Sequence, residues 1–231
     1  MLLEVNKLSF GYDRKEIVRN LSFTVEKGDY LCVIGENGAG KTTLIKVLLN
    51  LKKPYSGTIN FSDGLTQHEI GYLPQHTSVQ KDFPATVREI VLSGCLGRLG
   101  KKFFYDEEDC KLADESIRRM KIEALADRCY NELSGGQQQR VLLARCLCAT
   151  RKLIILDEPS TSLDYETTCE MYQLIAQLNR EGIAIIMISH DLDKALDQAK
   201  HILLLEDEDS FFGTRDEYLE SRRKARVIGN D

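Results

Sequence analysis

The run GENGAGKT at residues 35–42 restricts the possible folds of this chain more than any other feature. It fits the pattern G-x-x-x-x-G-K-[ST] with no mismatch, and it stands between the apolar run YLCVI and the apolar stretch TLIKVLLN. Gly35, Gly38 and Gly40 allow the backbone to turn its N–H groups inward at the start of a helix, where they can surround a phosphate. The context favours a strand–loop–helix unit that binds a nucleoside triphosphate over a chance glycine-rich turn.

Individual positions of this loop have expected roles. Lys41 supplies a mobile charge for the β- and γ-phosphates, and the Thr42 hydroxyl can be a ligand of Mg²⁺. ATP and Mg²⁺ are therefore the expected cofactors. The residues expected to bind the phosphates are Gly35, Glu36, Asn37, Gly38, Ala39, Gly40, Lys41, Thr42 and Thr43.

Two adjacent carboxylates follow a second apolar run, in LIILDEP at 153–159. We expect Asp157, at the end of a buried strand, to hold Mg²⁺ mostly through water, because this ion gives up its hydration shell reluctantly. Glu158 should point elsewhere and polarise a water molecule for attack on the γ-phosphate. Solvated acids at a strand end are common in isolation, but the phosphate loop in the same chain favours the catalytic interpretation.

Strand-like and helix-like segments alternate along the chain, which predicts a doubly wound α/β core. LIIL and IAIIMI are entirely apolar, as in strands that are buried on both faces of a parallel sheet. From about 84 to 132 the chain is charged and punctuated by glycine, and we expect a helical insert there. Strands are expected at 2–10, 22–34 (with a turn at Gly28 and Asp29), 58–61, 70–73, 153–156, 183–188 and 202–205. Helices are expected at 43–50, 135–149, 165–180, 192–199 and after Thr214, which has Glu217 at capping-box spacing.

Composition limits the class of protein. A chain of 231 residues suits one large domain, or a core with a subdomain, and we take 1–231 as a single domain. The net charge of −5 disfavours nucleic acid as a partner, because nucleic-acid binding needs a basic face. No apolar run approaches the ~18–20 residues that span a bilayer, and the first residues lack a signal-peptide pattern. The seven cysteines include no C-x-x-C pair, so we expect reduced packing thiols in a cytosolic protein and no transition-metal site.

The stretch NELSGGQQQR at 131–140 has the S-x-x-Q spacing of a capping box, so a helix should begin at Ser134. Alone, this is compatible with a simple helix cap. Together with both phosphate motifs, LSGGQ resembles the signature of ABC-type ATPases, and the motifs follow that family's order along essentially the whole chain. The resemblance implies a P-loop NTPase core of ABC ATPase type, with an antiparallel β subdomain and an inserted helical subdomain at roughly 84–140.

The resemblance also implies roles for further residues. Tyr12 in FGYDRK matches the aromatic residue that stacks on adenine, and Gln75 in YLPQ matches the glutamine that senses Mg²⁺ and the transport subunit. Asp164 in STSLD matches a residue that touches the opposing subunit. His190 in ISHD matches the histidine that contacts the γ-phosphate and orients the catalytic carboxylate. An ordinary surface, loop or strand-end residue is the alternative for each, and we expect structural or exposed roles for His68, His76 and His201.

In this family, two nucleotide-binding domains pack head to tail, so that the signature turn of one copy faces the γ-phosphate held by the other. The resemblance therefore implies that Ser134, Gly135, Gly136 and Gln137 of a second copy complete the site. ATP would bind the closed pair better than the open pair, and hydrolysis would remove that difference. With one phosphate loop and one signature in the chain, the expected assembly is a homodimer.

Membrane subunits must be separate chains if the protein drives transport, which implies a peripheral position on the cytoplasmic face of the membrane and a separate solute-binding protein. DFPATVREIVLSG at 82–94 and FFGTRDEYLES at 211–221 resemble segments of the ATPase subunits of zinc/manganese-type importers. An importer for another substrate and a non-transport ATPase that signals through membrane proteins remain open. A DNA-repair or ribosome-associated relative is disfavoured by the length and by the absence of heptads.

Overall fold

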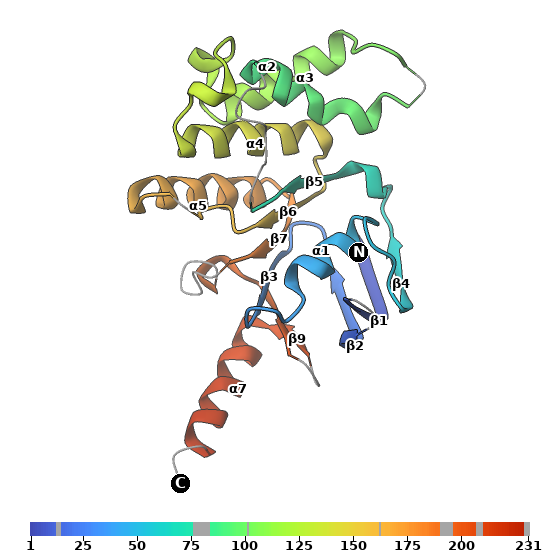
Figure 1. Cartoon of the computed structure of the whole chain (residues 1–231). Coiled ribbons are helices and arrows are strands. Elements are labelled where there is room, and N and C mark those ends of the chain that lie inside the picture. The colour runs from blue at the N-terminus through green and yellow to red at the C-terminus, as the bar shows by residue number, and fades with distance from the viewer. Residues whose placement is uncertain are drawn as a thin grey trace. The chain divides into compact units, whose positions relative to one another are not determined.

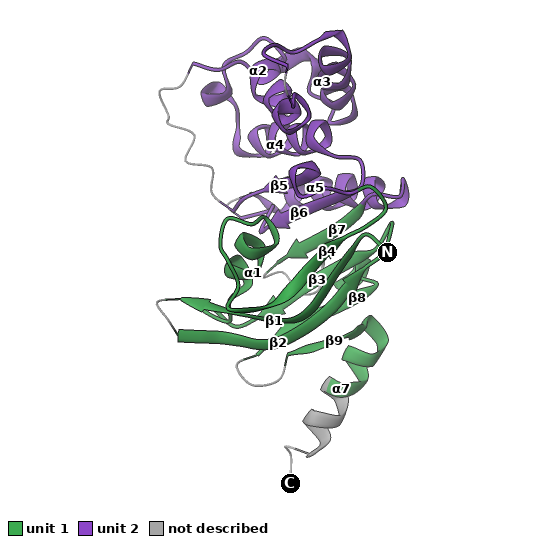
Figure 2. Ribbon diagram, turned by 90° about the vertical axis from the view of Figure 1, so that its right-hand side faces the viewer, with its two compact units in different colours: residues 1–64, 184–231 green, residues 65–183 purple. Residues whose placement is uncertain are grey.

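A computed structural model describes residues 1–12, 15–75, 84–100, 102–161, 163–189, 196–206 and 210–228, with side chains as far as residue 221. The chain divides into two compact units (Figure 2). Unit 1 consists of residues 1–64 and 184–231, and unit 2 of residues 65–183. In the described ranges, no helix has both the length and the apolar character needed to cross a membrane.

Unit 1 contains an antiparallel sheet in which β1 lies between β2 and β4. In a regular strand, residues three positions apart point to opposite faces, yet Val5 and Leu8 of β1 are both buried. A register shift between them, with Lys7 in the left-handed region at φ 47°, restores the inward direction. This confirms the antiparallel β subdomain. The bounds are β1 Leu3–Tyr12, β2 Lys15–Val25 and β4 Ser56–Phe61.

The second sheet of unit 1 carries the phosphate loop (Figure 1). β3 lies between β7 and β8 and runs parallel to both, and β9 is antiparallel to β8. Tyr30 to Ile34 of β3 are all buried, as expected for a strand that is covered on both faces. The bounds are β3 Tyr30–Gly35, α1 Lys41–Leu48, β7 Ala184–Ile188, β8 His201–Leu205, β9 Phe211–Thr214 and α7 Arg215–Ile228.

Unit 2 combines a parallel strand pair, β5 and β6, with a cluster of helices (Figure 2). Glycine permits close packing against α4, because a Cβ on Gly94 would lie 2.1 Å from the carbonyl oxygen of Arg145. Capping boxes start α2 at Thr86, α3 at Asp106 and α4 at Ser134. The bounds are β5 Ile70–Leu73, α2 Val87–Leu92, α3 Glu107–Arg119, α4 Gly135–Ala149, β6 Leu153–Asp157 and α5 Tyr165–Arg180, with 3₁₀ helices at Gln67–Glu69, Ser93–Arg98, Glu123–Leu125 and Tyr130–Glu132.

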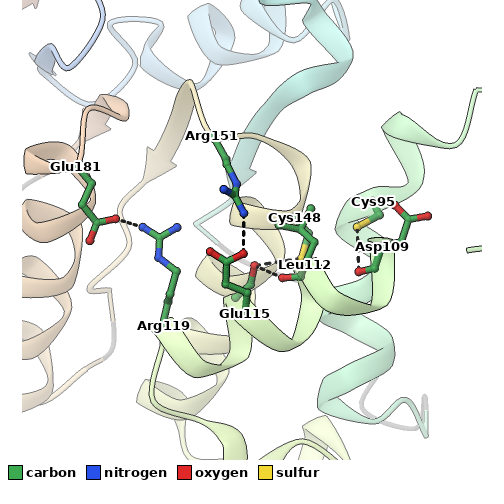
Figure 3. A network of polar contacts seen from close by, with 9 residues as sticks. Cys95, Asp109, Leu112, Glu115, Arg119, Cys148, Arg151 and Glu181 are labelled. Carbon is green, nitrogen blue, oxygen red and sulfur yellow. Dashed lines mark hydrogen bonds and ion pairs between the residues drawn. The ribbon is translucent and has the colours of Figure 1, made fainter. Parts of the chain in front are cut away.

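Ion pairs and buried thiols connect the helices of unit 2 (Figure 3). Arg151 pairs with Glu115 of α3 at 2.7 Å, and Arg119 pairs with Glu181. The Cys148 thiol donates to the Ser116 hydroxyl at 3.4 Å. The seven cysteines are free, and burial raises the pKa of the Cys32 and Cys146 thiols to about 12, as expected for packing thiols.

Most expected elements are present, but several bounds were wrong. The turn expected at Gly28 and Asp29 does separate β2 from β3, but β2 begins at Lys15, well before residue 22. β9 was not expected, because its four residues include Gly213 and show no alternation. The helix expected at 43–50 starts two residues earlier and ends at Leu48. Of the expected helix 192–199, residues 192–195 lie outside the described residues, and 196–198 are helical.

Candidate functional site

The phosphate loop of unit 1 has the backbone that its glycines predict. Gly38 and Gly40 have φ values of 90° and 95°, in the region that favours glycine. At Gly40 a Cβ would also approach the Phe10 ring to 3.2 Å. Residues 36–38 are exposed, whereas Ala39 and Gly40 are buried against the unit. The loop therefore presents its backbone to solvent at the start of α1.

The beginning of α1 suits an anion. Gly40 is its N-cap and offers no side-chain hydrogen bond, and the first turn contains no acidic residue. A helix start of this kind, with no acidic side chain and with the positive end of the helix dipole, is suited to an external anion. The ammonium of Lys41 donates to the carbonyl oxygens of Gly35 at 2.7 Å and Glu36 at 2.9 Å, so its charge is held over the loop. Thr42 is exposed at the same end.

Tyr12 at the end of β1 is 42% exposed, as an aromatic residue that stacks on a ligand must be. The ammonium of Lys52 lies over one face of its ring, 3.8 Å from the centroid, in a cation–π contact. Lys52 comes from the segment after α1, and no motif in the sequence pointed to it. The exposed ring and the phosphate loop belong to the same unit.

In unit 2, Asp157 ends β6 and is 3% exposed. Tyr72 of the adjacent strand β5 forms a hydrogen bond with it. Burial, and then the charge of Asp157 and this bond, raise the pKa of Tyr72 to about 12, so the phenol stays protonated and donates to the carboxylate. Asp157 is thus oriented at the strand end, as a metal-binding carboxylate needs to be.

Glu158 has different surroundings. Its φ of 53° is in the left-handed region, which is unusual for a residue with a side chain. One carboxylate oxygen, Oε2, accepts hydrogen bonds from the Gln75 amide at 2.6 Å and from the Thr161 hydroxyl at 3.0 Å. The structure therefore brings together two residues predicted from distant motifs, and adds a third that sequence analysis missed.

The SGGQ turn starts α4 as expected. The Ser134 hydroxyl accepts from the Gln137 N–H at 3.4 Å, and the Gln137 side chain accepts from the Ser134 N–H at 3.0 Å. Asp164 caps α5 by accepting from the N–H of Thr167 at 2.9 Å, and its bonds with Thr167 lower the pKa of Asp164. Thr167 also packs against Gly136, where a Cβ would lie 2.4 Å from its Cγ2 methyl. The signature turn and the Asp164 turn are therefore neighbours.

His190 and His76 lie outside the described residues. His68 is exposed, and His201 bonds to the buried Asp29 at 2.8 Å. Among the described residues, no group of three or more His, Cys, Asp or Glu side chains is arranged to hold a metal ion. Thr167 and Lys52 lie in no quoted motif. Tyr72 lies in YLPQ, and Thr161 lies in STSLD, three residues after Glu158, but sequence analysis assigned neither of them a role.

Unit 1 thus contains a phosphate loop, and unit 2 contains strand-end carboxylates and a capped SGGQ turn, which together define a P-loop ATPase. The family follows from comparison with known proteins. The ABC transporter family model matches residues 18–161, and the chain belongs to this family. It is accordingly an ATP-binding and ATP-hydrolysing subunit of the transport type.

Individual relatives resemble nearly the whole chain. The zinc uptake system ATP-binding protein ZurA of Listeria innocua is 35% identical, over 94% of this chain and 87% of its own length. The manganese transport system ATP-binding protein MntB of Bacillus subtilis is 36% identical, over 88% of this chain and 82% of its own length. The structure of cbiO1 from Clostridium perfringens, part of the ABC transporter complex cbiONQ, has a TM-score of 0.81 at 27% identity and covers 98% of this chain and 94% of that one. A dimeric structure is known for another bacterial ABC transporter cassette, MJ0796, which has a TM-score of 0.72 at 26% identity and covers 91% of this chain and 98% of that one.

Proposed function

We propose that this chain powers the import of a divalent transition-metal ion, zinc or manganese, through separate membrane subunits. The observation that carries the proposal is the similarity, over most of the chain, to relatives whose names specify zinc and manganese transport. Transported ions would pass through the membrane subunits. The proposal therefore requires no transition-metal site in this chain, only ATP hydrolysis coupled to a partner.

Within the ATPase site, the residues that fit the phosphates are those of the loop 35–43, with the charge of Lys41 toward the β- and γ-phosphates. The open, uncapped start of α1 supports this assignment. Thr42, Gln75 and Asp157 are the residues that would hold Mg²⁺. When bound, this ion would neutralise charge on the β- and γ-phosphates.

Glu158 is the proposed general base, which would accept a proton from the attacking water. His190 is proposed to orient it, and the Gln75 amide contacts the same carboxylate. Tyr12 is proposed to stack on adenine, with the base on the ring face opposite Lys52 or in place of Lys52.

The proposed working form is a head-to-tail dimer in which the residues of the SGGQ turn, 134–137, and Asp164 reach the nucleotide of the partner copy. Two glycines in the first turn of α4, Gly135 and Gly136, support this arrangement, because a backbone without side chains permits a close approach. We further propose that the dimer binds the cytoplasmic face of the membrane subunits and that a separate solute-binding protein delivers the ion.

Metal uptake by cells with and without the chain tests the transported ion. Deletion should impair growth and uptake of labelled zinc or manganese under limitation, and the wild-type gene should restore both. A Lys41→Ala chain, which lacks the phosphate-loop charge, should fail to restore them. Unchanged uptake of both ions, with ATP hydrolysis intact, would instead favour another substrate class or a signalling ATPase.

A further inference from the structure

The position of Glu158 depends on a strained turn. Residues Glu158 to Thr161 form a turn that is closed by a hydrogen bond of 3.2 Å from the Thr161 N–H to the Glu158 carbonyl. Pro159 occupies the second position of this turn, which its fixed φ favours. Glu158 itself is in the left-handed region, a conformation that persists in non-glycine residues only where the surroundings hold it.

The side chain of Thr161 makes a second hydrogen bond to Glu158. Its hydroxyl donates to Oε2 of Glu158 at 3.0 Å. Backbone and side chain of Thr161 thus restrain both ends of Glu158, the carbonyl and the carboxylate. Because threonine is branched at Cβ, its χ1 angle has few options and the direction of the hydroxyl is well defined.

Gln75 cannot replace this restraint throughout the reaction cycle. Its amide reaches the same oxygen from the segment after β5, eighty-three positions away in the chain. Gln75 is also proposed to hold Mg²⁺, and the family resemblance links it to the transport subunit, so we expect it to leave Glu158 during the cycle. Thr161 is on the same turn as Glu158 and can stay bonded when Gln75 moves.

We infer that Thr161 is a positioning residue for ATP hydrolysis, which directs the carboxylate of Glu158 through the bond between its hydroxyl and Oε2. The inference rests on the proposed role of Glu158 as general base. No proton passes through Thr161, which keeps its own proton and donates a hydrogen bond. Its contribution is the orientation of a base toward the attacking water.

The test is ATP turnover by the full-length chain carrying Thr161→Val, which removes the hydroxyl at nearly constant shape. We expect kcat to fall by about 10- to 100-fold, the loss that follows from a misplaced reacting group, with ATP affinity unchanged. Thr161→Ser, which keeps a hydroxyl, should recover most of the rate. Thr214→Val is the matched control, because the Thr214 hydroxyl also bonds a carboxylate, that of Glu217 at 2.9 Å, at the start of α7.

A double-mutant cycle separates positioning from a general structural effect. In a Glu158→Gln background, Thr161→Val should not lower the residual single-turnover rate further, because the group that Thr161 directs is already lost. An equal loss in both backgrounds, or an unchanged kcat in Thr161→Val, would overturn the inference. Equal rates for Glu158→Gln and wild type would instead overturn the proposed role of Glu158.

Discussion

At the scale of single residues, the two neighbouring carboxylates at the end of β6 have unlike surroundings. Asp157 is buried and takes a hydrogen bond from Tyr72, whereas Glu158 is half-buried and bonded to Gln75 and Thr161. The backbone separates them, because only Glu158 has a left-handed φ. The two acids therefore point in different directions, which suits the different tasks proposed for them, holding a metal ion and activating a water molecule.

Replacing Glu158 by Gln should stall hydrolysis while ATP binding is kept. The amide keeps the shape of the side chain but cannot accept the proton of the attacking water, so turnover should fall by about 10²- to 10⁴-fold. Turnover of labelled ATP and equilibrium binding are the measurements, and the ATP-loaded protein should accumulate as a dimer in size-exclusion chromatography. Glu123→Gln, at an exposed position, is the control and should hydrolyse ATP normally. Normal hydrolysis by Glu158→Gln would exclude the catalytic role of Glu158.

At the scale of elements, the start of α4 is held against the start of α5. Gly136, in the first turn of α4, leaves no room for a side chain beside Thr167, in the first turn of α5. Thr167 in turn bonds Asp164, the residue that caps α5. The glycine of the SGGQ turn therefore has a packing role within the chain in addition to its proposed role toward nucleotide.

Gly136→Ala should destabilise the fold, because the new Cβ would overlap the Thr167 methyl and overpacking typically costs about 1–3 kcal/mol. Thr167→Ser removes that methyl but keeps the hydroxyl that bonds Asp164. The double variant should therefore unfold at a higher temperature than Gly136→Ala alone. Thermal unfolding of the single and double variants measures this, and no recovery in the double variant would contradict the packing role.

At the scale of the whole molecule, each chain contains one phosphate loop and one signature turn. In the proposed head-to-tail dimer, each site takes the loop from one copy and the turn from the other. ATP hydrolysis then requires the dimer. A defect in the loop or in the turn of one copy affects a site to which the other copy also contributes. A site formed within one chain would show no such dependence.

Mixing two inactive variants distinguishes these arrangements. Lys41→Ala should abolish nucleotide binding at its own loop, and Ser134→Arg should block the turn that faces the partner. A mixed dimer contains one site with both defects and one intact site, so mixing should restore ATP turnover, measured after the separate variants are shown to be inactive. Turnover that stays absent although mixed dimers form would contradict the shared site.

Local sequence patterns determined much of this protein. GENGAGKT predicted the loop and the start of α1, and the spacing of Ser134 and Gln137 predicted the capping box of α4. Strand 70–73 and helix 165–180 agree with their expected bounds, because periodicity and breakers act over a few residues. The order of these motifs along the chain also predicted the family, and the match to the family model confirms it.

Tertiary structure decided the contacts between distant segments. Tyr72 beside Asp157, Lys52 over Tyr12 and Gln75 on Glu158 join residues that no local pattern connects. The same holds for the short edge strand β9, which exists because β8 offers it a partner. Periodicity records which face of an element is buried, but it carries no information on which neighbour lies there. Packing alone selects that neighbour, and with it the orientation of each side chain proposed to be catalytic.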